Sequence, residues 1–202
     1  MRASAILTCF AAALSLAVTA PATSAPPEPT AGTAVVDGLC EDWDLSGDSF
    51  AVMRRLWSTA KSLECRAYLR YDCDRQMLFV LVLAESGVAG RADSPSAGVS
   101  SWVAIGSAAA HAVDSRCGND GVPPDFAWVE PGFDGDPSHV RGFEASVPLG
   151  PTSTTIYIHQ NPFDAVPSGE QHVSSQSGTQ MVISCTTGTE SSTWSQLKML
   201  YR

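Results

Sequence analysis

The sequence predicts an all-β protein, a jelly-roll-like antiparallel β-sandwich with one short helix at most. Short segments that are apolar, or that alternate between apolar and polar residues, recur along the chain. Gly, Pro and Asp mark turns between them at roughly ten-residue spacing, as in sandwich folds. Only 16% of the 202 residues are charged, and Ser, Thr, Gly and Pro are abundant. This composition is more typical of a secreted β domain than of a helical cytosolic protein.

The clearest element is a hairpin between Arg66 and Glu85. Residues 68–71 alternate as in a strand, and residues 72–76 form a polar turn. Residues 77–84 are an unbroken apolar run rich in Val and Leu, too short for a membrane helix. We therefore expect the second strand of this hairpin to be buried on both faces.

Further short strands are expected after the hairpin. The best alternation places Ile156 and Ile158 on one face of a strand and Thr155, Tyr157 and His159 on the other. The segments expected to form strands are 99–104, 125–129, 140–149, 154–159 and 180–185, and residues 108–113 fit either a strand or a helical turn.

One segment before the hairpin has a helical spacing of apolar residues. Between Phe50 and Leu63 they recur three or four positions apart, at Phe50, Met53, Leu56, Trp57 and Ala60. A helix of two or three turns fits this spacing. A loop that lays a few apolar anchors over a sandwich fits it equally well, and both interpretations stay open.

The N-terminal residues resemble a secretory signal. Arg2 precedes an apolar stretch from Ala5 to Ala20, and small residues suited to cleavage follow. A membrane anchor is the alternative, but the stretch is short for a span of roughly 20 residues. We expect a signal peptide at 1–25, a disordered leader at 26–32, the sandwich at 33–185 and a tail at 186–202. The mature chain of about 175 residues is then secreted, forms one domain and has no membrane span.

The charge balance argues against two classes of partner. The net charge is −9 and the isoelectric point is about 4.7. An acidic protein is repelled by phosphate backbones and by anionic membrane surfaces, so we expect no nucleic-acid partner.

The cysteines indicate a disulfide framework. Cys9 lies in the expected signal, which leaves an odd set of five in the mature chain. We expect two disulfides and one spare thiol, with about 15 arrangements open to the sequence. Our working pairing joins Cys73 to Cys185, and Cys40 to Cys65 or Cys117. There is no Cys-x-x-Cys pair, so a zinc site is a weak alternative.

Four blocks of sequence resemble one known superfamily. The blocks are Val36-Asp37-Gly38-Leu39-Cys40-Glu41-Asp42-Trp43-Asp44-Leu45, the hairpin with Tyr68-Leu69-Arg70-Tyr71-Asp72-Cys73, the stretch from Gly118 to Trp128, and Gly142-Phe143-Glu144-Ala145. In this order they resemble carbohydrate-binding-module family 9 and the DOMON-like β-sandwiches. The resemblance implies a sandwich of two antiparallel sheets and a non-catalytic binding module. Cys40 and Cys65 depart from the family pattern.

In sugar-binding relatives, aromatic side chains contact the sugar and a calcium ion often supports the loops. On that basis the candidate ligand-binding residues are Trp57, Trp102 and Tyr157. The candidate calcium ligands are Asp42, Asp44, Asp120 and Asp125, since Ca²⁺ takes oxygen ligands from loops. The alternatives are aromatic residues that pack in the core, as we expect for Trp43 and Trp128, and acidic residues that cap their own turns.

No catalytic motif is visible in the sequence. The four histidines lack metal-ligand spacing, and there is no Gly-x-Ser-x-Gly nucleophile elbow. The expected function is therefore a secreted, non-catalytic module that binds an extracellular or cell-surface carbohydrate. The alternative is a structural or interaction protein of a cell wall or matrix, with a matrix protein as partner and no small ligand.

Overall fold

The computed structural model describes residues 25–55, 63–92, 99–163 and 174–185. These residues form strands and loops without a helix, which confirms the all-β prediction. The strands are β1 (Thr30–Ala31), β2 (Ser49–Arg55), β3 (Leu63–Asp72), β4 (Met77–Ala84), β5 (Ala89–Arg91), β6 (Ser101–Ile105), β7 (His111–Asp114), β8 (Phe126–Val129), β9 (His139–Val140), β10 (Gly142–Pro148), β11 (Ser153–Gln160), β12 (Pro162–Phe163) and β13 (Ser174–Val182).

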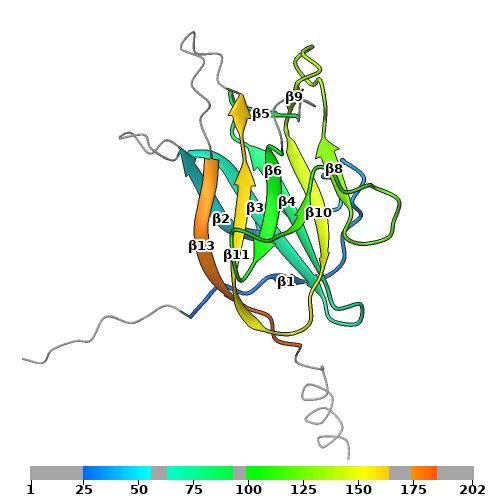
Figure 1. Ribbon diagram of the computed structural model, residues 1–202, viewed down its shortest axis with the longest axis vertical. Coiled ribbons are helices and arrows are strands. Elements are labelled where there is room, and N and C mark those ends of the chain that lie inside the picture. Colours follow the sequence, from blue (N-terminus) through cyan, green and yellow to red (C-terminus); the bar gives the residue numbers. More distant parts are fainter. Residues whose placement is uncertain (1–24, 56–62, 93–98, 164–173, 186–202) are drawn as a thin grey trace, which may run out of the picture.

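Most strands belong to one continuous sheet that folds over on itself. Its order is β7-β6-β11-β13-β2-β3-β4-β10-β8, and β1 pairs with β3 beside this path. Only two residue pairs join β13 to β2. This short connection divides the sheet into two layers, and Figure 1 shows β6, β11 and β13 lying across β3 and β4. A second, small sheet has the order β12-β5-β9.

The predicted central hairpin is confirmed. β3 and β4 pair antiparallel, from Cys65 opposite Ala84 to Asp72 opposite Met77. Five consecutive residues of β4, 78–82, are buried, as expected for a strand covered on both faces. Alternate side chains of β4 point into two separate clusters, because successive strand residues face opposite sides of a sheet.

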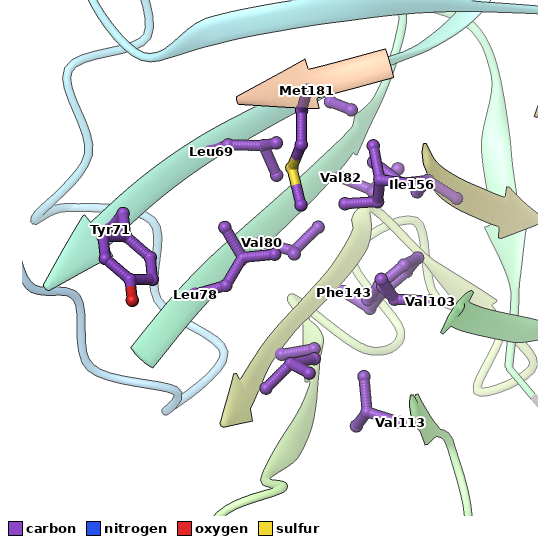
Figure 2. Close-up of a cluster of buried hydrophobic side chains, with 14 of the residues drawn as sticks. Leu69, Tyr71, Leu78, Val80, Val82, Val103, Val113, Phe143, Ile156 and Met181 are labelled. Carbon is purple, nitrogen blue, oxygen red and sulfur yellow. The ribbon is translucent and has the colours of Figure 1, made fainter. Parts of the chain in front are cut away.

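The larger cluster fills the space between the two layers. Figure 2 shows side chains from β3 and β4 facing those of β6, β11 and β13 across this space. The members drawn and labelled there include Leu69, Leu78, Val80, Val82, Val103, Phe143, Ile156 and Met181, all fully buried. A smaller cluster covers the opposite face of β3 and β4 and contains Ala34, Trp43, Tyr68, Phe79, Leu81 and Val129.

Neither sequence interpretation of the segment from Phe50 to Leu63 is right for its first part. Residues 49–55 form strand β2, and the pairing with β3 shifts by one residue at Phe50. This β-bulge lets Phe50 and Ala51, as well as fully buried Met53, pack against the main core. An apolar spacing of three, which is typical of a helix, therefore comes from a strand with an extra residue. Residues 56–62 lie outside the described part.

The boundary between the leader and the domain also needs correction. Thr30 and Ala31, which we expected in a disordered leader, pair in parallel with Arg70 and Tyr71 of β3. The Thr30 hydroxyl donates to the Asp48 carboxylate, which is also bound by the Arg70 guanidinium at 2.7 Å. The ordered sandwich therefore begins before Thr33.

One of the expected disulfides is confirmed and the other is wrong. Cys73 and Cys185 are bonded, with their Cα atoms 5.6 Å apart. Cys40 and Cys117 are free thiols. Cys40 packs on the smaller cluster, whereas Cys65 and Cys117 belong to or pack on the larger one. The sheet therefore separates Cys40 from both expected partners.

The predicted signal peptide and C-terminal tail fall outside the described part of the chain. Residues 1–24 and 186–202, which we assigned to a signal peptide and a tail, lie outside the described residues. Within the described part, no helix is long and apolar enough to span a membrane.

Candidate functional site

The outer face of β6, β11 and β13 carries two of the three predicted ligand-binding residues. Ile156 and Ile158 point into the core, so Thr155, Tyr157 and His159 point outward, as the alternation predicted. Trp102 lies opposite His159 on the neighbouring strand β6. The structure thus brings Trp102 and Tyr157 to one surface, which we call the outer aromatic face. Trp57 lies outside the described residues.

Trp102 is enclosed by two histidine rings. Its indole stacks on His111 with ring centroids 4.4 Å apart and on His159 with centroids 4.9 Å apart. The interplanar angles are 12° and 4°, so the three rings form a nearly parallel stack across β7, β6 and β11. Both faces of the indole are covered in this arrangement. Trp102 can therefore offer a ligand its edge, but not a stacking surface.

His159 is neutral at physiological pH. Burial lowers the pKa of His159 to about 4, against a hydrogen bond with Asn161 that favours the charged form. The ring stack therefore contains a neutral imidazole on the β11 side. At the edge strand, His111 and Arg116 both contact the Asp114 carboxylate, and Arg116 holds the pKa of that carboxyl below its usual range.

Tyr157 on β11 lies opposite a β-bulge in the neighbouring strand β13. The pairing of β11 with β13 is irregular between Ile156 and Ile158, and Gly178 opposite has a φ of +61°. A Cβ placed on Gly178 would come within 2.8 Å of Cε1 of Tyr157. The tyrosine ring thus occupies the space that a side chain at residue 178 would fill. This leaves the ring half-buried, supported from below by backbone.

A hydrogen-bonded pair of uncharged side chains lies beside Tyr157. The Gln180 side-chain amide donates to the Thr155 hydroxyl over 2.7 Å, next to the tyrosine. Strands β6 and β11 and residues 178–182 contain no Asp, Glu, Lys or Arg. A protein with a net charge of −9 therefore has a polar and aromatic face that is free of permanent charge along these strands.

A concave region lies on the opposite side of the sandwich. It has a volume of about 670 Å³. Its floor is formed by Met77 and Phe79 of β4 and by Ser146 of β10, which point away from the main core. We call this region the groove. One wall is residues 34–36, and the other is the loop 119–125, with Arg75 at one end.

A buried carboxylate fixes the segment that forms the first wall. Glu144 is fully buried on β10 and accepts hydrogen bonds from the backbone N–H groups of Asp37 (3.1 Å) and Gly38 (2.8 Å). Its other oxygen accepts a bond from the Trp43 indole N–H. Burial raises the pKa of Glu144 to about 7, against these three hydrogen bonds, which lower it.

These contacts join three of the four sequence blocks on which the family resemblance rests. Gly38 and Trp43 from the first block meet Glu144 from the last. Gly38 also lies so close to the third block that a Cβ there would be 2.4 Å from the Trp128 carbonyl oxygen. Trp43 is buried, as expected for a core tryptophan, and Trp128 packs edge-on against Phe126.

The predicted calcium ligands each accept hydrogen bonds from nearby groups in the structure. One oxygen of Asp42 accepts the Val35 N–H, and Asp44 binds the Ser46 N–H and hydroxyl within its own turn. Asp120 and Asp125 likewise bind backbone N–H groups of their own loop, at Val122 and Gly121. No three His, Cys, Asp or Glu side chains of the described residues converge as a metal site.

Several contact residues were not anticipated from the sequence. The ring stack places His111 and His159 beside Trp102, and the groove uses Arg75 and Ser146. The alternation of β11 had already placed His159 on the face of Tyr157. No local sequence pattern predicts the groove, because its walls come from segments that are far apart in the chain.

Comparison with known proteins adds no relative. The chain matches no protein-family model, no curated protein and no solved structure.

Proposed function

We propose that this protein is a secreted, non-catalytic module that binds a neutral extracellular polysaccharide through its outer aromatic face. The observation that carries the proposal is the position of Tyr157, whose ring lies over Gly178 between uncharged hydrogen-bonding side chains. An aromatic ring supported in this way offers an apolar platform to the C–H face of a sugar. Thr155 and Gln180 supply groups that suit sugar hydroxyls.

The chemistry of the surface supports a neutral ligand. The side chains on β6, β11 and residues 178–182 lack permanent charge, and His159 is neutral because burial lowers its pKa to about 4. A charged ligand would find no partner on these strands. The resemblance to carbohydrate-binding-module family 9 and the DOMON-like sandwiches points in the same direction. In this proposal Trp102 braces the surface through its ring stack rather than stacking on the sugar.

A panel of immobilised polysaccharides tests the proposal. The panel contains neutral glucans, xylans and mannans together with pectin and alginate, which carry uronic acids. We expect the full chain to bind at least one neutral polymer, with little change between low and high salt, because few charges take part. Binding restricted to the acidic polymers, or no binding by a folded protein, rejects the proposal.

A second candidate is a structural protein of a wall or matrix without a small ligand. The observation that favours it is the pair of half-buried free thiols, Cys40 and Cys117, on opposite sides of the β3–β4 layer. Such thiols can form intermolecular disulfides in an oxidising compartment. A disulfide-linked oligomer on a non-reducing gel supports this candidate, and a monomer under oxidising conditions rejects it.

A further inference from the structure

The groove and the outer aromatic face lie on opposite sides of the molecule. The groove floor uses Phe79 and Ser146, which point away from the main core, while Tyr157 points away from the same core on the other layer. Packed sheets lie about 10 Å apart, so the two surfaces are separated by on the order of 20 Å once side chains are included. A ligand segment a few sugars long cannot contact both.

The groove is lined by both polar and apolar side chains. Its polar groups are the guanidinium of Arg75, the amide of Asn119, the hydroxyl of Ser146 and the carboxylate of Asp125. These groups supply both donors and acceptors, as sugar hydroxyls require. Met77 and Phe79 form an apolar floor beneath them.

Two of these polar groups, on Asp125 and Ser146, are held by hydrogen bonds within the protein. The Asp125 N–H donates to the Ser146 hydroxyl oxygen over 3.1 Å, and both residues are buried at the base of the groove. Asp125 Oδ1 accepts the Gly121 N–H at 3.1 Å, which orients the carboxylate. The Arg75 guanidinium lies 3.6 Å from the Asp72 carboxylate, and its side chain is 70% exposed. The volume of about 670 Å³ lies within the range of pockets that hold small ligands.

We propose that the groove is a second binding site for a neutral sugar segment and that the protein therefore bridges two polysaccharide chains. The inference rests on the proposed function, because a bridge needs the outer aromatic face as its other contact. It joins the two candidate functions: a module with glycan sites on both sides holds a wall or matrix together.

The test counts binding sites and follows cross-linking. The full chain is titrated by calorimetry with hexasaccharides of glucose, xylose and mannose, and light scattering follows its mixture with the matching long polymers. The variants are Tyr157→Ala on the outer aromatic face and the pair Arg75→Gln with Asn119→Ala in the groove. Leu45→Ser, an exposed residue outside both surfaces, is the matched control.

The bridge predicts two hexasaccharides per chain in the wild type and in Leu45→Ser. Each site variant should bind one, and should lose the increase in scattering while keeping a folded circular-dichroism spectrum. A wild-type stoichiometry of one that Tyr157→Ala abolishes and the groove variant preserves overturns the bridge and leaves the proposed function standing. A stoichiometry of one that only the groove variant abolishes overturns both the bridge and the assignment to the outer aromatic face.

Discussion

The indole of Trp43 donates a hydrogen bond to the carboxylate of Glu144 over 2.9 Å, across a sequence separation of 101 residues. Together with the Asp37 and Gly38 N–H groups, this bond fastens the N-terminal segment to β10. The segment covers the smaller cluster and forms one wall of the groove.

Removing the carboxylate should destabilise the fold. Glu144→Ala leaves two buried donors and one partly buried donor without an acceptor. Each such loss costs about 1–3 kcal/mol, less where water can replace the lost acceptor. We expect the free energy of unfolding in urea to fall by about 2–4 kcal/mol at pH 7. Glu28→Ala, which removes an exposed contact with Ser184, is the control and should change it by less than about 0.5 kcal/mol. Equal effects would contradict the role of Glu144.

Glu144 and His159 should give opposite pH dependences. The pKa of Glu144 is raised from 4.5 to about 7, so its contribution is most favourable below pH 4.5 and is lost as the pH rises through 7. The pKa of His159 is lowered from 6.5 to about 4, so its contribution is present above pH 6.5 and is lost as the pH falls through 4. Each shift corresponds to about 3 kcal/mol.

In the wild type the pH dependences of stability due to Glu144 and His159 nearly cancel. Single variants separate the two contributions. Urea unfolding of Glu144→Gln should show stability rising between pH 4.5 and 6.5, because the opposing contribution of Glu144 is removed and that of His159 remains. His159→Gln should show stability falling between pH 4.5 and 7. Curves that run parallel to the wild type in both variants would reject the assigned pKa shifts.

The close approach of Gly38 to Trp128 gives a matched comparison of two glycines. Gly38 has a φ of +81° and Gly87 has a φ of +84°, so alanine suffers the same backbone strain at both positions. Only at position 38 would the new Cβ meet an atom, the Trp128 carbonyl oxygen at 2.4 Å, since nothing lies within 4 Å at position 87. Gly38→Ala should therefore lose about 1–3 kcal/mol more than Gly87→Ala in urea unfolding. Equal losses of unfolding free energy in the two variants would mean that the backbone around residue 38 can move away from Trp128 without a loss of stability.

The disulfide should stabilise the fold by lowering the conformational entropy of the unfolded chain. Cys73 and Cys185 are 112 residues apart in sequence, and a loop of that length loses about 4–5 kcal/mol of chain entropy in the entropic description. The double variant Cys73→Ser with Cys185→Ser should lower the unfolding free energy by up to that amount. Cys117→Ser, which removes a free thiol, is the control. A double variant as stable as the control would contradict the prediction.

Local patterns in the sequence predicted strands well and their partners poorly. The hairpin of β3 and β4 was readable because apolar residues, a polar turn and a second apolar run follow one another. The strand β2 was misread because a bulge at Phe50 breaks the alternation of two. β1 was missed because Thr30 and Ala31 depend on contacts with Arg70 and Asp48, residues that are remote in sequence.

Only part of the candidate site could be predicted from the sequence, for the same reason. The alternation of β11 placed Tyr157 outward, but the covering of Trp102 by His111 and His159 depends on how β7, β6 and β11 align. Calcium binding by the acidic residues stays a prediction, and the structure shows Asp44 and Asp120 binding the backbone of their own turns. The groove depends on the fastening of residues 34–38 to β10, which no local pattern reports.

The binding role of Tyr157 is tested most directly by affinity electrophoresis of the full chain in native gels that contain the neutral polysaccharide bound in the panel. Wild-type protein should be retarded, and Tyr157→Ala should lose about ten-fold in affinity or more, since it removes the apolar platform. Phe133→Ala, which removes an exposed aromatic ring elsewhere on the surface, should migrate like the wild type. Retardation of folded Tyr157→Ala equal to that of the wild type would contradict the account.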